Sequence, residues 1–133
     1  MSRGQSLVEL AVCAPVIVLL TLGAAAIVEI VDARAGLEAA TRAAADEAAR
    51  APDPISAERA AQDSFASTVA AYPLRSATLR ITFGGFNRAD RVVASATGLI
   101  DLSWAAMVVP GRLTLDSRVE IPLEAWRTHA LQQ

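Results

Sequence analysis

The residues that could carry chemistry are few and lie far apart along this chain of 133 residues. The single histidine, His129, has no Cys, Asp or Glu cluster around it at metal-ligand spacing. Ser95, Ser103 and Ser117 have no base near them in the sequence, and the glycine pair at 84–85 lacks the strand-loop-helix setting of a phosphate-binding loop. We therefore predict that the protein is not an enzyme and has no catalytic residues, cofactor or metal site.

One ionisable residue has an unusual setting. Glu9 stands in "RGQSLVELAVCAP", directly before a long uncharged run, and no further acid follows until Glu29. A charged side chain at the edge of a membrane-length segment is costly when it has no partner. The position of Glu9 therefore requires an explanation.

The uncharged run extends from Leu10 to Val28 and contains ten Leu, Ile or Val residues among its 19. As a helix it would be about 28 Å long, close to the thickness of the hydrocarbon core of a bilayer. Pro15 lacks an amide hydrogen and its ring crowds the carbonyl of Ala11, so we expect a kink there, which membrane helices tolerate. The sequence predicts a transmembrane helix over about residues 10–28, with Cys13 as a small apolar member.

The flanks of the run predict its orientation. Arg3 and the α-amine lie on the short N-terminal side, so the positive-inside rule leaves the N-terminus cytoplasmic and places roughly 100 C-terminal residues outside. Two alternatives remain open. Ala24 and Ala26 form the A-x-A pattern of a cleaved secretory signal, and an apolar helix could also be buried in a soluble protein.

The helical pattern continues beyond the apolar run. Alanine, the best helix former, dominates as far as Pro52, so one helix is expected from Ser6 to Ala51, within a helical region 5–51. Charges of alternating sign recur every four residues and mark a solvated face: Arg34, Glu38, Arg42, Asp46 and Arg50. Small residues recur at the same spacing and predict a helix-packing face, either in this domain or between subunits: Gly36, Ala40, Ala44 and Ala48.

The remaining residues, 52–133, predict a small external α+β domain. Pro52 and Pro54 break the helix, Ser56 can cap a shorter helix over 57–72, and Pro73 ends it. Alternating apolar and polar residues predict three strands over 78–83, 91–104 and 112–121, with turns at 84–90 and 110–112. Such an antiparallel sheet needs helices to cover its apolar face. Trp104 and Trp126 are interpreted as aromatic residues of the core or its rim.

The net charge of −2 offers no broad basic surface, so no nucleic-acid partner is expected.

The opening stretch resembles the class III signal of type IV pilin-like proteins, in which a prepilin peptidase cuts after a glycine and an acid stands at the fifth mature position. More narrowly, it resembles the TadE-like minor pseudopilins of the tight-adherence (Flp-type) pilus system. The residues that match the start of that family are Gly4, Val8, Glu9, Ala11 and Pro15. Leu10 stands where the major Flp pilin has an aromatic residue, which favours a minor component.

The resemblance implies a leader peptide over residues 1–4, cut between Gly4 and Gln5. It implies a non-catalytic role in starting, capping or decorating a pilus, with Glu9 setting register by pairing with the freed α-amine of a neighbouring subunit. The implied partners are the prepilin peptidase, the major Flp-type pilin, other minor pilins, the inner-membrane assembly platform and, before assembly, membrane lipid. The location would be the bacterial cytoplasmic membrane, and then the pilus. The alternative is an uncleaved single-pass membrane protein whose external domain binds a partner and has no filament role.

Overall fold

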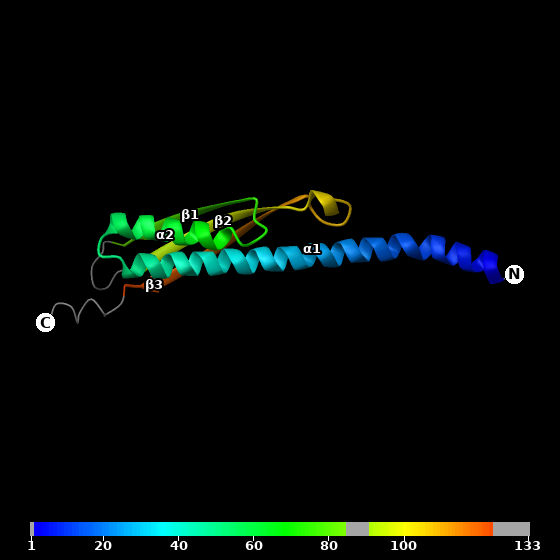
Figure 1. Ribbon diagram of the computed structural model, residues 1–133, viewed down its shortest axis with the longest axis horizontal. Coiled ribbons are helices and arrows are strands. Elements are labelled where there is room, and N and C mark those ends of the chain that lie inside the picture. The colour runs from blue at the N-terminus through cyan, green and yellow to red at the C-terminus, as the bar shows by residue number, and fades with distance from the viewer. Residues whose placement is uncertain (1, 85–90, 124–133) are drawn as a thin grey trace.

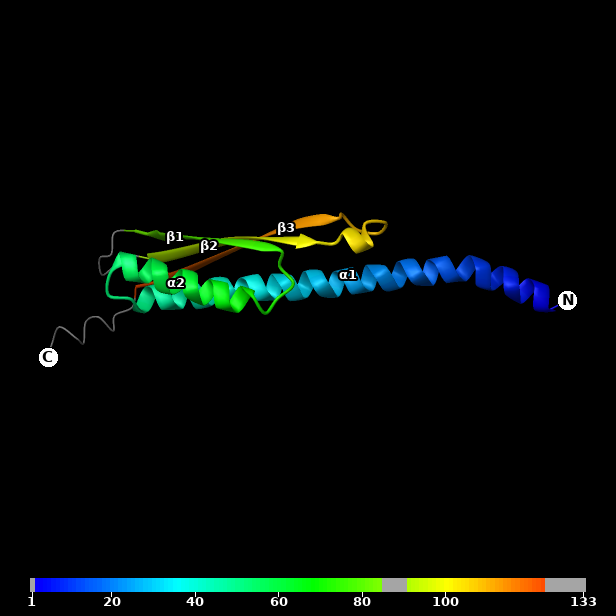
Figure 2. The ribbon, with the colours of Figure 1, turned by 45° about the horizontal axis from the view of Figure 1, so that its top comes forward.

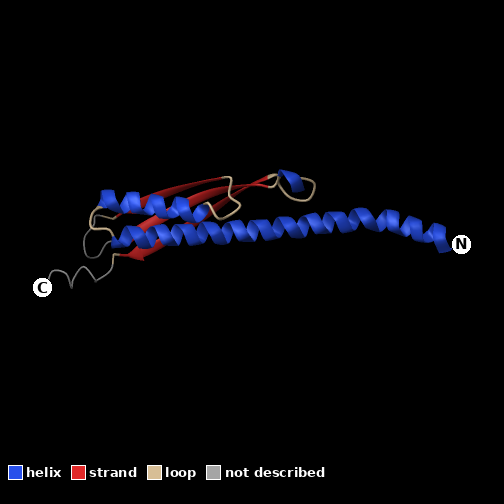
Figure 3. Ribbon diagram, in the orientation of Figure 1, coloured by secondary structure: helices blue, strands red, loops and turns tan. Residues whose placement is uncertain are grey.

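The fold consists of one long helix with a small layered domain on its C-terminal half (Figures 1 and 3). The computed structural model describes residues 2–84 and 91–123. The helices and strands follow one another in the order α1 (Ser2–Arg50), α2 (Pro54–Val69), β1 (Ser76–Phe83), β2 (Arg91–Asp101), η1 (Ser103–Ala105, a 3-10 turn) and β3 (Arg112–Pro122). At 1.5 Å per residue, the 49 residues of α1 are about 74 Å long. The predicted α+β class is confirmed.

The three strands form an antiparallel sheet in the order β1-β2-β3. Ala94 in the central strand pairs with Ile81 of β1 and with Val119 of β3. Alternate residues of β2 are buried, whereas the inward residues of the two outer strands are half-buried and their intervening polar residues face solvent. The period-two patterns therefore predicted the inner face of each strand correctly.

Both helices lie on the same face of the sheet, with α2 beside the C-terminal half of α1 (Figures 1 and 2). The core between these layers is mostly alanine, and its larger members include Leu37 of α1 and Phe65 of α2. Alanine side chains allow the two helix backbones and the sheet to approach closely. The C-terminal half of α1 is therefore part of the core of the domain.

The small-residue face of α1 lies inside this domain. Ala40, Ala44 and Ala48 are fully buried in the main core cluster. Gly36 is buried too, and the ring of Tyr72 lies directly over it. In the single chain, these four residues therefore pack within the domain.

The start of α2 differs from the prediction. Asp53, not Ser56, is the N-cap, because its carboxylate accepts a hydrogen bond of 2.9 Å from the backbone N–H of Ser56. Pro54 occupies the first turn, where its missing N–H costs nothing. The helix therefore begins earlier than predicted, and it ends at Val69 instead of reaching Tyr72.

Other boundaries differ as well, and β1, for example, begins at Ser76 instead of Thr78. α1 already begins at Ser2 instead of Ser6. β2 ends at Asp101 instead of Trp104, because the Asp101 carboxylate accepts a hydrogen bond of 3.0 Å from the backbone N–H of Ser103 and turns the chain into η1. Trp104 consequently lies in η1 with 46% of its surface exposed. His129, Trp126 and residues 85–90 of the predicted turn lie outside the described residues.

Candidate functional site

The N-terminal part of α1 carries the candidate site, and it extends away from the domain (Figure 1). Every residue from Arg3 to Thr21 is exposed. Over the described ranges 2–84 and 91–123, α1 is the one helix long and apolar enough to cross a membrane. Its large exposed apolar side chains in this part are Leu7, Val8, Leu10, Val12, Val16, Ile17, Val18, Leu19 and Leu20. Such a surface is stable in lipid or among other apolar helices, which supports a membrane-anchored protein.

Glu9 lies on this exposed surface, one helical turn after Gln5 and on the same side of α1. None of the ion pairs between described residues includes Glu9. The nitrogen of Gln5 belongs to a peptide bond in the intact chain, so an amine would exist there only after cleavage behind Gly4. The surface around Gly4 is open, since a Cβ placed on it would meet no atom within 4 Å.

The middle of the span is continuous helix. α1 passes through Pro15 without a break, and its N-terminal end bends away from the axis of the rest (Figure 2). The hydroxyl of Thr21 donates a hydrogen bond of 2.8 Å to the carbonyl of Ile17. The one hydroxyl in the apolar run is thereby satisfied within the helix, as lipid requires.

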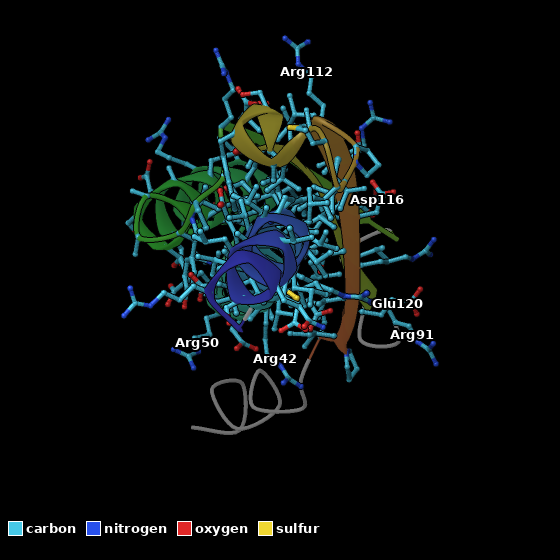
Figure 4. All side chains as sticks on the ribbon, turned by 90° about the vertical axis from the view of Figure 1, so that its right-hand side faces the viewer. Arg42, Arg50, Arg91, Arg112, Asp116 and Glu120 are labelled. Atoms are coloured by element: carbon cyan, nitrogen blue, oxygen red, sulfur yellow. The ribbon has the colours of Figure 1, made fainter. Side chains whose placement is uncertain are left out.

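The described surface of the domain carries charges of both signs. In the part of the chain that the structure describes, no group of three His, Cys, Asp or Glu residues could hold a metal ion. An open cleft of about 490 Å³ between α1 and β3 is lined by charges of both signs, including Arg42 and Asp116. Figure 4 shows labelled charged side chains such as Arg91 and Glu120 directed outward around an interior of carbon atoms.

One feature near the span is absent from the expectations above. The loop from β2 to β3, residues 102–111, returns to α1, and Val108 lies against Gly23. The predicted strand over 91–104 and the predicted turn over 110–112 cover only the two ends of this loop, and no element was predicted for residues 105–109. The signal that could have revealed it is "LSWAAMVVPG", ten consecutive residues without a charge.

The fold and the long apolar N-terminal helix indicate a membrane-anchored α+β protein. Residues 4–50 match the model of the family of TadE-like proteins, and this match supports a TadE-like protein of the Tad pilus system. The match includes Gly4, Glu9 and Pro15 and ends with α1. The chain shows no significant similarity to a curated protein or to a solved structure.

Proposed function

We propose that this protein is a minor pilin that contributes, without catalysis, to the assembly of a Tad/Flp-type pilus by initiating, capping or decorating it. The observation that carries the proposal is the TadE-like match over a helix whose N-terminal part is exposed from Arg3 to Thr21. A helix anchored in lipid can move from the membrane into a bundle of similar helices, because both surroundings are apolar.

The proposed maturation step is removal of residues 1–4 by a prepilin peptidase. Cleavage frees an α-amine on Gln5, one turn from Glu9. In a filament the Glu9 carboxylate of one subunit would then pair with the amine of its neighbour. Loss of either partner leaves an uncompensated charge in an apolar bundle, which is strongly unfavourable, so the pair sets the register of the subunits.

The proposed partners follow from this route. The chain is held in the bacterial cytoplasmic membrane with its N-terminus inside and its α+β domain outside, in agreement with Arg3 on the short N-terminal side. It then meets the inner-membrane assembly platform, the major Flp-type pilin and other minor pilins.

The test compares Glu9→Ala with Glu29→Ala in cells that make the pilus. Glu29 is a matched control, because it is the acid at the other end of the apolar run. The number of pili per cell and the amount of this protein in sheared pili are measured. We expect Glu9→Ala to lower at least one of these and to leave the protein in the membrane, while Glu29→Ala behaves as wild type.

Assembly by Glu9→Ala equal to that of wild type would refute the registry role. If deletion of the whole protein left the number of pili per cell unchanged, and sheared wild-type pili contained none of the protein, it would instead be a single-pass membrane protein without a filament role.

A further inference from the structure

The loop between β2 and β3 lies against the outer part of the membrane helix. Residues 102–111, here called the hairpin tip, include η1 and extend past the sheet along α1 toward its N-terminus (Figures 1 and 2). Val109 of the tip and Ile30 of α1 both pack against the small buried cluster of Ala33, Ile100 and Leu102. Farther down the helix, a Cβ placed on Gly23 would lie 3.3 Å from Cγ1 of Val108. These contacts fix the tip at the level of Gly23.

That level lies inside the apolar run. Gly23 precedes the end of the run at Val28 by five residues, or about 7.5 Å along the helix axis. If the run occupies the hydrocarbon core, the tip cannot remain in water above the membrane. It must lie among the headgroups and the upper acyl chains of the outer leaflet.

The side chains of the hairpin tip suit that depth. Met107 is 86% exposed, and Trp104 and Val108 are almost half exposed. Among the described residues of the external domain, the other large apolar side chain that is exposed is Ile55, at the opposite end. Tryptophan is enriched at membrane interfaces, where its ring is at the level of the headgroups.

Charged residues begin directly above the tip. Asp101 and Arg112 are paired in the register of β2 and β3, and Arg75 forms an ion pair with Asp101. The hydrogen bond from the backbone of Ser103 lowers the pKa of Asp101, with a smaller contribution from the charge of Arg75. Asp101 is therefore ionised at neutral pH. Arg112 points away from the body of the molecule (Figure 4), and Glu29 starts the polar part of α1.

We propose that the hairpin tip is a second membrane contact, which inserts Trp104, Met107 and Val108 into the outer interface of the bilayer. The proposed partner of the tip is lipid, because the tip continues the apolar surface of α1. The charged residues begin at a similar level on the strands, at Asp101 and Arg112, and on α1, at Glu29. Interfacial elements commonly insert about 5–10 Å, which agrees with the level of Gly23. Together, the membrane span of α1 and the hairpin tip would fix the orientation of the domain about the axis of α1. The inference rests on the membrane span of α1 and goes beyond the proposed role in a pilus.

The test uses full-length chains with a single tryptophan, in vesicles of phosphatidylcholine and phosphatidylglycerol that contain brominated phosphatidylcholine. Trp126→Phe leaves Trp104 alone. Two control chains combine Trp104→Phe and Trp126→Phe with either Ile55→Trp, at the far end of the domain, or Leu20→Trp, in the middle of the span. Fluorescence quenching is measured with bromine placed near the headgroup or near the chain end.

Bromine near the headgroup is expected to lower Trp104 emission at least about two-fold, as for an interfacial side chain. Leu20→Trp should respond most to bromine near the chain end, and Ile55→Trp to neither. Met107→Asp, added to the Trp126→Phe chain, should reduce the quenching of Trp104, because a charge at this depth is costly.

Quenching of Trp104 no stronger than that of Ile55→Trp would overturn the proposal, as would blue-shifted Trp104 emission without quenching, which indicates cover by protein. Quenching unchanged by Met107→Asp would exclude insertion through these side chains. An unquenched Leu20→Trp would remove the membrane span and the proposal together. None of these measurements depends on pilus assembly, so failure of the tip contact and failure of the pilus role are distinguishable.

Discussion

The aromatic ring of Tyr72 packs directly on the backbone of α1 at Gly36, and a Cβ at that position would overlap the ring. Tyr72 lies in the connection between α2 and β1, so this contact joins the end of the short helix to the middle of the long one. Glycine is costly in a helix interior. Its presence here is explained by the close approach of the ring.

Replacing Gly36 by alanine should therefore destabilise the domain, by about 1–3 kcal/mol, although alanine is the better helix former. In a Tyr72→Ala background the same change should stabilise it by about 0.5–1 kcal/mol, since only the helix preference remains. Thermal unfolding of the four full-length chains in detergent micelles, followed by circular dichroism, measures both effects. A destabilisation of equal size in both backgrounds would show that the ring is not the cause.

The alanine face of α1 gives a second prediction. Ala44 is fully buried and Ala39, on the same helix, is exposed. Ala44→Leu should cost about 1–3 kcal/mol of unfolding free energy through overpacking, whereas Ala39→Leu should have little effect. Denaturant unfolding of the two variants and the wild type in detergent micelles measures the difference in unfolding free energy. Equal stability of the two variants would mean that α2 and the sheet do not pack on this face as described.

Asp53 predicts a dependence of stability on pH. Hydrogen bonds from the side chain and backbone of Ser56 lower the pKa of Asp53 below its ordinary value of 3.8. The unfolded chain therefore binds a proton more readily than the folded one. The stabilisation by ionised Asp53 is fully present above pH 3.8 and is lost as the pH falls through the lowered pKa.

Asp53→Asn keeps an oxygen acceptor for the cap but removes this titration. Wild type should exceed Asp53→Asn in melting temperature at neutral pH, and the difference should shrink at pH values well below 3.8. Asp63→Asn, which changes an exposed acid in the middle of the same helix, serves as the control. A wild-type advantage that stayed constant over this pH range would contradict the role of the charge.

Much of the fold follows from local patterns. The alanine-rich continuation beyond Val28 predicted one helix through to the domain, and the alternation in "TLRITF" and "RLTLDSRVEI" predicted the inner faces of β1 and β3. Two of the errors lie where a side chain forms a hydrogen bond with a backbone group. Asp53 captures the N–H of Ser56, and Asp101 captures that of Ser103. Both are acidic residues at a chain reversal, and the spacing of apolar residues does not indicate which side chain there caps the backbone.

The candidate site was less predictable than the fold. Glu9 could be singled out because a lone acid before an apolar run is unusual, but its proposed partner belongs to another chain. The position of the hairpin tip depends on a contact between residues far apart in sequence, Gly23 and Val108. In the sequence, only the absence of charged residues from 102–111 could have indicated it. The packing of Gly36 and Ala44 inside the domain likewise could not be predicted without knowing where α2 lies.

We propose that Glu9 is tolerated because cleavage behind Gly4 creates an amine for it to pair with. The intact mass of the protein, purified from the membranes and the pili of cells that contain the peptidase, tests this proposal. We expect a chain that begins at Gln5 and lacks residues 1–4. A chain in functional pili that still carries these residues, or one cut after Ala26, would contradict it.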